Sequence, residues 1–165
     1  MGKLCKALIC LFVLLILSGC NFFKKDLKKF SRSGITITLP NEFTREGSDG
    51  LIQFYVLSND HTFMGNGTSK TDSYIVDEGI TDLDGYTEQV LYLYKVEFKT
   101  YSDEDTLFNY AFYVSDTDDG EYTYMSITME GESKYYAMAL RCKSSIFTDD
   151  VKVMYMEWAK TIRVE

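Results

Sequence analysis

The chain has 165 residues, of which 45% are hydrophobic and 15% aromatic, and its formal net charge is −8. This length suits one domain, and the apolar content is high enough for a hydrophobic core, which excludes a mainly disordered protein. The acidic excess argues against a nucleic-acid partner, because Lys and Arg supply most of the affinity for phosphate.

The first twenty residues are typical of an export signal. Lys3 and Lys6 precede an unbroken apolar run of eleven residues, 7–17. This run is too short for a membrane-spanning helix, which needs about 20 residues, but it fits the apolar part of a signal. It ends in Leu17-Ser18-Gly19-Cys20, which resembles the lipobox of bacterial lipoproteins.

The lipobox resemblance implies a lipid anchor. In that family the cysteine, here Cys20, receives a diacylglyceryl group, the signal over 1–19 is cleaved, and the new amino terminus is often acylated. We therefore expect a protein anchored by acyl chains such as palmitate on the extracytoplasmic face of a cell membrane. The alternatives are an uncleaved anchor and an ordinary cleavage site with an incidental cysteine. Loss of Lys3 and Lys6 would take the net charge from −8 to −10 and leave Cys142 as the one free thiol.

A short basic stretch follows the lipobox. We predict a lipidated tether over 20–33 and one globular domain over 34–165. The tether contains Lys24, Lys25, Lys28 and Lys29. Lysines near anionic headgroups each contribute about 1 kcal/mol of membrane affinity, so the tether is expected to have some affinity for the surface. A plain spacer is the alternative.

Short extended segments are predicted in the first half of the domain at 35–39, 51–57, 62–68 and 74–76. The first alternates apolar and polar residues and ends at Pro40. The second is followed by the turn-forming Ser58-Asn59-Asp60. Gly65 and Gly67 weaken the prediction for the third segment.

Two helices are predicted from capping residues and apolar spacing. Thr81 with Asp84 fits a capping box, followed by helical spacing through Tyr94. Thr148 is expected to cap the last helix, whose apolar face ends at Ile162.

Three longer strands are predicted between these helices, at 107–114, 122–129 and 135–142. They are joined by two hairpin turns, in which Gly120 and Gly131 are expected to supply positive φ. Successive hairpins make an antiparallel meander. The predicted fold class is therefore α+β, with an antiparallel sheet of five to seven strands packed with two helices.

The order of these elements resembles the Mog1/PsbP-like α/β/α sandwich. The features that carry the resemblance are the strand Gly34–Pro40, the stretch Lys134-Tyr-Tyr-Ala-Met-Ala-Leu-Arg, and its continuation from Phe147-Thr-Asp-Asp to Trp158-Ala-Lys-Thr-Ile-Arg-Val. Many bacterial members are small lipoproteins. Known members, such as a photosystem II extrinsic subunit and a nuclear transport cofactor that binds a small GTPase, act mainly by binding proteins. No motif carries a functional residue of theirs over to this chain.

No catalytic constellation stands out. His61 is the one imidazole and is expected to be an exposed turn residue. Cys142 shares a strand face with Met138 and Leu140, which indicates a small buried side chain in place of a nucleophile. We predict no catalytic residue.

No cofactor or metal is predicted either. One histidine and one free cysteine do not make a zinc site. The acidic loops at 82–85 and 116–120 fail the EF-hand spacing and are interpreted as a helix cap and a hairpin turn.

Tyr122 and Tyr124 form the one candidate interaction surface. They alternate with Ser126 and Thr128 on one face of a strand, and tyrosine is enriched at binding interfaces. In a sandwich covered on both sides, we expect this face to lie under a helix, which is the competing interpretation.

The expected function is that of a non-enzymatic, membrane-anchored lipoprotein that binds another protein of the cell envelope. The expected partners are membrane lipid through acylated Cys20 and an envelope protein, without nucleic acid. The alternative is a small-ligand-binding lipoprotein with a pocket between sheet and helix.

Overall fold

The structure is a computed structural model of the chain, and it describes residues 26–45, 48, 50, 52–96 and 107–165. The lipobox Leu17-Ser18-Gly19-Cys20 lies outside the described residues. So do Leu51 and residues 97–106.

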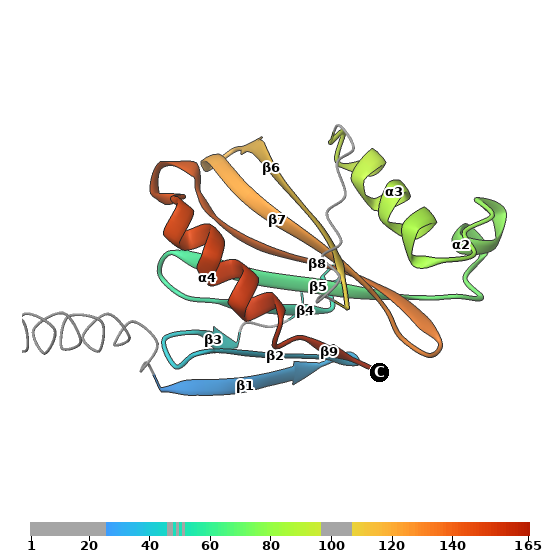
Figure 1. Cartoon of the computed structure of the whole chain (residues 1–165), viewed down its shortest axis with the longest axis horizontal. Helices are drawn as coiled ribbons and strands as arrows, with labels where there is room; N and C mark the ends of the chain where they lie inside the picture. The colour runs from blue at the N-terminus through green and yellow to red at the C-terminus, as the bar shows by residue number, and fades with distance from the viewer. Residues whose placement is uncertain (1–25, 46–47, 49, 51, 97–106) are drawn as a thin grey trace, which may run out of the picture.

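The described strands form two antiparallel sheets (Figure 1). The three-stranded sheet has the order β1-β2-β9, with β1 Leu27–Arg32, β2 Ile35–Pro40 and β9 Arg163–Val164. The six-stranded sheet has the order β3-β4-β5-β8-β7-β6. Its strands are β3 Thr44–Arg45, β4 Phe54–Leu57, β5 His61–Ser69, β6 Asn109–Thr117, β7 Gly120–Glu130 and β8 Lys134–Lys143. The α+β class and an antiparallel sheet of the predicted size are confirmed.

Helices lie on both faces of the six-stranded sheet. The described helices are α2 Ser73–Asp77, α3 Leu83–Leu93 and α4 Asp149–Ala159, with a 3₁₀ turn at Ser144–Ile146. Figure 1 shows α3 on one side of the sheet, and α4 with the three-stranded sheet on the other. We call the side that carries α3 the outer face and the side toward α4 the inner face.

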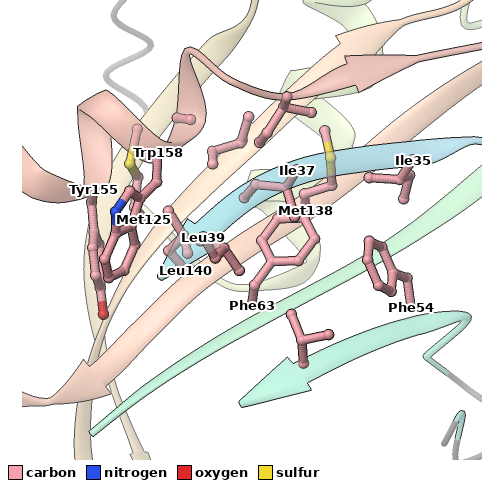
Figure 2. Packing of buried hydrophobic residues seen from close by; sticks show 14 of the residues in the cluster. Ile35, Ile37, Leu39, Phe54, Phe63, Met125, Met138, Leu140, Tyr155 and Trp158 are labelled. Atoms are coloured by element: carbon pink, nitrogen blue, oxygen red, sulfur yellow. The ribbon is translucent and has the colours of Figure 1, made fainter. Parts of the chain in front are cut away.

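The main core fills the space between the inner face, α4 and the three-stranded sheet. Ile37 and Leu39 of β2 are fully buried and meet Phe63 and Leu140 of the six-stranded sheet (Figure 2). Trp158 of α4 packs edge to face on Phe43, with ring centroids 5.4 Å apart. The alternation that predicted strands at 35–39, 122–129 and 135–142 therefore reflects burial of one strand face.

Glycines allow the two sheets to approach each other. A Cβ on Gly65 of β5 would lie 2.9 Å from Ile35 Cδ1 of β2 and 2.8 Å from Met138 Cγ. A Cβ on Gly67 would lie 2.8 Å from a ring carbon of Tyr136. Gly65 and Gly67 weaken the strand predicted at 62–68, but β5 includes both: Gly65 makes room for Ile35 of the opposite sheet, and Gly67 makes room for Tyr136 of the neighbouring strand β8.

Tyr136 packs closely against glycines and forms a hydrogen bond with Glu165. It is buried, and Gly34 and Gly131 both have positions where a Cβ would lie within 3 Å of its side chain. Its hydroxyl donates a hydrogen bond to the carbonyl of Glu165, 3.1 Å away. Gly120 has the positive φ predicted for it, whereas Gly131 does not, so the prediction for Gly131 was wrong: that glycine is needed for close approach.

The folded region begins earlier than predicted. Residues 27–32, assigned to the tether over 20–33, form β1, which pairs with β2 along its whole length. Phe30 is the reason, because its side chain is buried in the main core. The three-stranded sheet was not foreseen, since the pairing of β2 with β9 joins segments at opposite ends of the chain.

Local predictions failed where a side chain had a stronger competing partner. Residues 74–76, predicted as a strand, belong to helix α2, which Asp72 caps by accepting from the backbone N–H of Tyr74. The cap of α3 is Asp82 and not Thr81, and Asp84 accepts a hydrogen bond from Asn109 instead of closing a capping box. Thr148 caps α4 as predicted.

We predict that Gly131→Ala lowers the free energy of unfolding by about 1–3 kcal/mol, because the new methyl group overlaps the last carbonyl of the chain and the ring of Tyr136. Urea unfolding followed by the fluorescence of Trp158 measures the change. The matched control is Glu132→Ala, at an exposed position of the same turn, which should alter stability by less than about 0.5 kcal/mol. Equal stability of the two variants would contradict the close packing at Gly131.

Candidate functional site

Helix α3 covers only part of the outer face. Some of its contacts with the sheet are polar: the Thr87 hydroxyl donates to the carbonyl of Leu83 and lies 2.7 Å from the hydroxyl of Thr128. Asn109 donates to Asp84 Oδ1 at 2.8 Å and to Thr87 Oγ1 at 3.1 Å. These bonds fix the helix over one end of β6 and β7, because buried polar groups without partners are costly.

A smaller apolar cluster completes this contact. Tyr86 of α3 stacks on Tyr135 of β8, with ring centroids 5.0 Å apart and an interplanar angle of 18°. Ile75 of α2 and Val90 of α3 join the same cluster. The helix is therefore held near Thr128 and Tyr135, and the opposite end of the outer face lies beyond it.

A row of aromatic and basic side chains occupies that opposite end. Strand register places Tyr113, Tyr124 and Arg141 side by side on β6, β7 and β8. Tyr113 and Tyr124 stack almost in parallel, with centroids 5.0 Å apart and planes 7° apart. Tyr94, just after α3, stacks on the other side of Tyr113 at 5.8 Å. We call Tyr94, Tyr113, Tyr122, Tyr124 and Arg141 the tyrosine surface.

Arg141 links the members of this surface. Its guanidinium group lies 4.7 Å from the ring centre of Tyr122 and 5.7 Å from that of Tyr124. Nη1 donates a 2.9 Å hydrogen bond to the Tyr124 hydroxyl. Nε is buried and has no hydrogen-bond partner in the described part of the chain. Burial alone lowers the pKa of Arg141. The hydrogen bond to Tyr124 and the nearby phenols raise the pKa by more than burial lowers it, so the guanidinium group keeps its charge.

The tyrosine surface is accessible although its rings support one another. Tyr113, Tyr122, Tyr124 and Arg141 are half-buried, and Tyr94 is 59% exposed. The neighbouring outer-face residues of β4 and β5 are half-buried as well: Tyr55, Leu57, Thr62 and Met64. Burial, followed by the phenols of Tyr94 and Tyr124, raises the pKa of Tyr113, so its hydroxyl stays protonated at neutral pH.

The expectation that a helix covers this face is correct for one half only. Ser126 and Thr128 are buried at the α3 end, whereas Tyr122 and Tyr124 lie beyond the helix with their rings 6.5 Å apart. Sequence reasoning identified these two tyrosines but missed Tyr113 and Arg141. The turn at 118–119 fixes the register of β6 with β7, which places Tyr113 beside Tyr124. The turn at 131–133 fixes the register of β7 with β8, which places Arg141 there as well.

A second cluster joins the residues considered for catalysis. His61 was expected in an exposed turn, but it begins β5, is half-buried, and its Nδ1 lies 3.0 Å from the Tyr155 hydroxyl. It also pairs with Cys142 across the strands and packs edge to face on Trp158. The prediction of an exposed residue was wrong because α4 places two aromatic rings against this imidazole.

The chemistry of this cluster is that of a core. Cys142 is buried, as predicted, and burial raises the pKa of its thiol. Burial also raises the pKa of Tyr155. An activated thiol needs the opposite shift, toward the thiolate. His61 and Cys142 are therefore close together because both pack against α4 in the core.

The acidic segments considered for calcium have structural roles. Asp82 caps α3, and Thr117 pairs with Gly120 across the β6–β7 turn. Over the residues that the structure describes, there is no group of three or more His, Cys, Asp or Glu side chains placed to hold a metal ion. Within the same residues, none of the helices has the length and apolarity needed to cross a membrane.

Comparisons show similarity to known proteins in fold alone. No protein-family model matches the chain, and no curated protein matches it by sequence. A crystal structure of a protein from Bacteroides thetaiotaomicron VPI-5482 is similar over 84% of this chain, with a TM-score of 0.54 and 12% identity. The match spans about half of that protein, 48% of its length.

A solution structure of a cyanobacterial PsbP, CyanoP from Synechocystis sp. PCC 6803, is also similar. The match has a TM-score of 0.49 and 12% identity, and it covers 88% of this chain and 96% of CyanoP. Similar solved structures therefore include a PsbP protein. A closer relation to the Mog1/PsbP-like group stays a prediction.

We predict that Cys142 reacts with a thiol reagent roughly 100-fold or more slowly in the folded protein than in urea, because the reagent reaches it only after opening of the core. Cys5, Cys10 and Cys20 are replaced by Ser so that one thiol remains. Since burial raises the pKa of Cys142, the native rate should stay low even above pH 9.0, the ordinary value for a thiol. Comparable rates in the folded and unfolded protein would contradict this assignment.

Proposed function

We propose that this protein is a membrane-anchored extracytoplasmic lipoprotein that binds another protein of the cell envelope through the tyrosine surface. The observation that carries the proposal is the stacked row of Tyr94, Tyr113 and Tyr124 with Arg141, which is accessible on the outer face. The lipid anchor is proposed from the sequence Leu17-Ser18-Gly19-Cys20.

The composition of this surface favours protein binding. Residues that dominate binding energy at interfaces are enriched in tyrosine and arginine, whose side chains combine a large contact area with a polar group. Parallel stacking of Tyr113 on Tyr124 and the bond from Arg141 hold these side chains in place before a partner arrives. Less conformational entropy is then lost on binding, which raises affinity.

The proposed role does not require catalysis. The sequence candidates for a nucleophile and base, Cys142 and His61, belong to the packed side of α4. The tyrosine surface offers phenol groups and a guanidinium, which donate hydrogen bonds and pack against apolar groups. A binding module of the Mog1/PsbP-like type fits both features.

We predict that Cys20→Ala abolishes lipid attachment. In a bacterial host the unchanged chain should be recovered from membranes as a mature form that begins at Cys20, with the added mass of a thioether-linked diacylglyceryl group. Intact-protein mass spectrometry of the membrane fraction checks this. A mature protein of unmodified mass, or membrane recovery of Cys20→Ala at the level of the unchanged chain, would contradict the anchor.

We predict that a photo-crosslinking amino acid at position 122 captures one discrete envelope protein in living cells. Capture should fall at least tenfold when Tyr124→Ala or Arg141→Ala is combined with the probe, because the row then loses its stacking or its cation. Mass spectrometry identifies the captured protein, and circular dichroism confirms that each variant folds.

The matched control places the same probe at position 74, where an exposed tyrosine of α2 lies outside the tyrosine surface. Equal capture of the same protein by probes at positions 74 and 122 would show that crosslinking is not specific to the tyrosine surface. Absence of a discrete adduct at 122 would count against the protein partner, and small ligands would then be screened by thermal stabilisation.

A further inference from the structure

We propose that the outward side of the three-stranded sheet rests on anionic phospholipid headgroups, so that the tyrosine surface points away from the membrane. This inference rests on the lipid anchor proposed above. It adds to that proposal an orientation of the domain and a second contact with lipid.

The chain between the anchor and the sheet is short. Strand β1 begins at Leu27, so residues 21–26 separate it from Cys20. Fully extended, this segment spans about 25 Å. Such a linker keeps the Leu27 end of β1 close to the lipid surface, whereas the linker expected from the sequence, which ended at residue 33, would allow the domain to move freely.

The outward side of this sheet has the composition of a surface that meets lipid headgroups. The strand register places on it the side chains of Leu27, Lys29, Ser31, Thr36, Thr38 and Arg163, which we call the basic sheet face. Lys29 and Arg163 are exposed, and Leu27, an apolar side chain nearest the anchor, is 59% exposed. Hydroxyl groups occupy most of the remaining positions.

Carboxylates lie at both ends of this face. Asp26 and Glu42 are exposed beside the Leu27 end, where the Asn41 N–H donates to the carbonyl of Asp26. Glu165 continues the outward alternation of β9 beside Gly34, at the end of the sheet farthest from Leu27. The chain as a whole carries a net charge of −8, which repels an anionic membrane. The charged side chains of the basic sheet face itself are Lys29 and Arg163, so a domain tethered within a few nanometres turns this face toward the headgroups.

The layers of the fold then determine what points outward. The three-stranded sheet packs over the inner face of the six-stranded sheet, through Ile35 at Gly65 and Met138 (Figure 2). The tyrosine surface lies on the outer face of that same sheet. A membrane on the basic sheet face leaves Tyr122 and Arg141 on the opposite side of the domain, available to a partner.

The test measures which side of the domain meets lipid. The lipidated full-length protein is reconstituted into phosphatidylcholine vesicles with or without 30 mol% phosphatidylglycerol, together with a lipid that carries a quencher on its headgroup. A fluorophore is attached at Ser31→Cys on the basic sheet face or, as the matched control, at Asp118→Cys in the β6–β7 turn. Quenching at 31 should exceed quenching at 118 at least twofold when phosphatidylglycerol is present.

Charge reversal distinguishes lipid contact from proximity alone. Lys29→Glu should lower quenching at 31 to the level at 118, whereas Lys143→Glu, the same charge change at an exposed position of the outer face, should leave it unchanged. Equal quenching at 31 and 118, or no response to phosphatidylglycerol and Lys29→Glu, overturns the orientation. Failure of the protein to float with vesicles would instead overturn the anchor, so the two failures are distinguishable.

Discussion

The contact between the two sheets is the constraint on which the rest of the structure depends. Ile35 approaches the six-stranded sheet at Gly65, and Tyr136 fits among glycines from three separate segments. This close approach buries the inner sides of both sheets and leaves α4 to fill the remaining space with aromatic side chains. Because the core occupies most of one side of the six-stranded sheet, side chains on the other side can vary with less effect on core packing.

The outer face has two parts, one covered by α3 and one that carries the tyrosine surface. Near Thr128 it is joined to α3 by a polar network around Thr87 and Asn109, and beyond that helix it carries the tyrosine surface. The two parts are linked, because Tyr94 follows α3 directly and stacks on Tyr113. The position of α3 therefore determines how far the tyrosine row extends, and the row in turn supports the carboxyl end of the helix.

Features that depend on local sequence were predictable. Alternation in 122–129 and 135–142 gave strands with their buried sides correct, and Thr148 gave the start of the last helix. Features that depend on pairing between distant segments were not. Nothing near residues 27–32 indicates that Phe30 joins the core, and Tyr122 and Tyr124 were identified without Arg141 because the register across two hairpins had not been worked out. At His61 the polar side chain suggested a turn, but the partners that bury it come from α4, almost a hundred residues later.

The pairing of β2 with β9 has a consequence for the order of folding. It joins Ile35 to Val164, and the Tyr136 hydroxyl binds the carbonyl of the last residue, Glu165. A growing chain can form the β6–β7–β8 meander as soon as those strands emerge, since their contacts are local. The three-stranded sheet cannot be completed before β9 is available, and such long-range pairing slows folding. Until β9 has formed, the apolar side of β2 has no complete cover, so the pairing of these two strands is the folding step most vulnerable to aggregation or proteolysis.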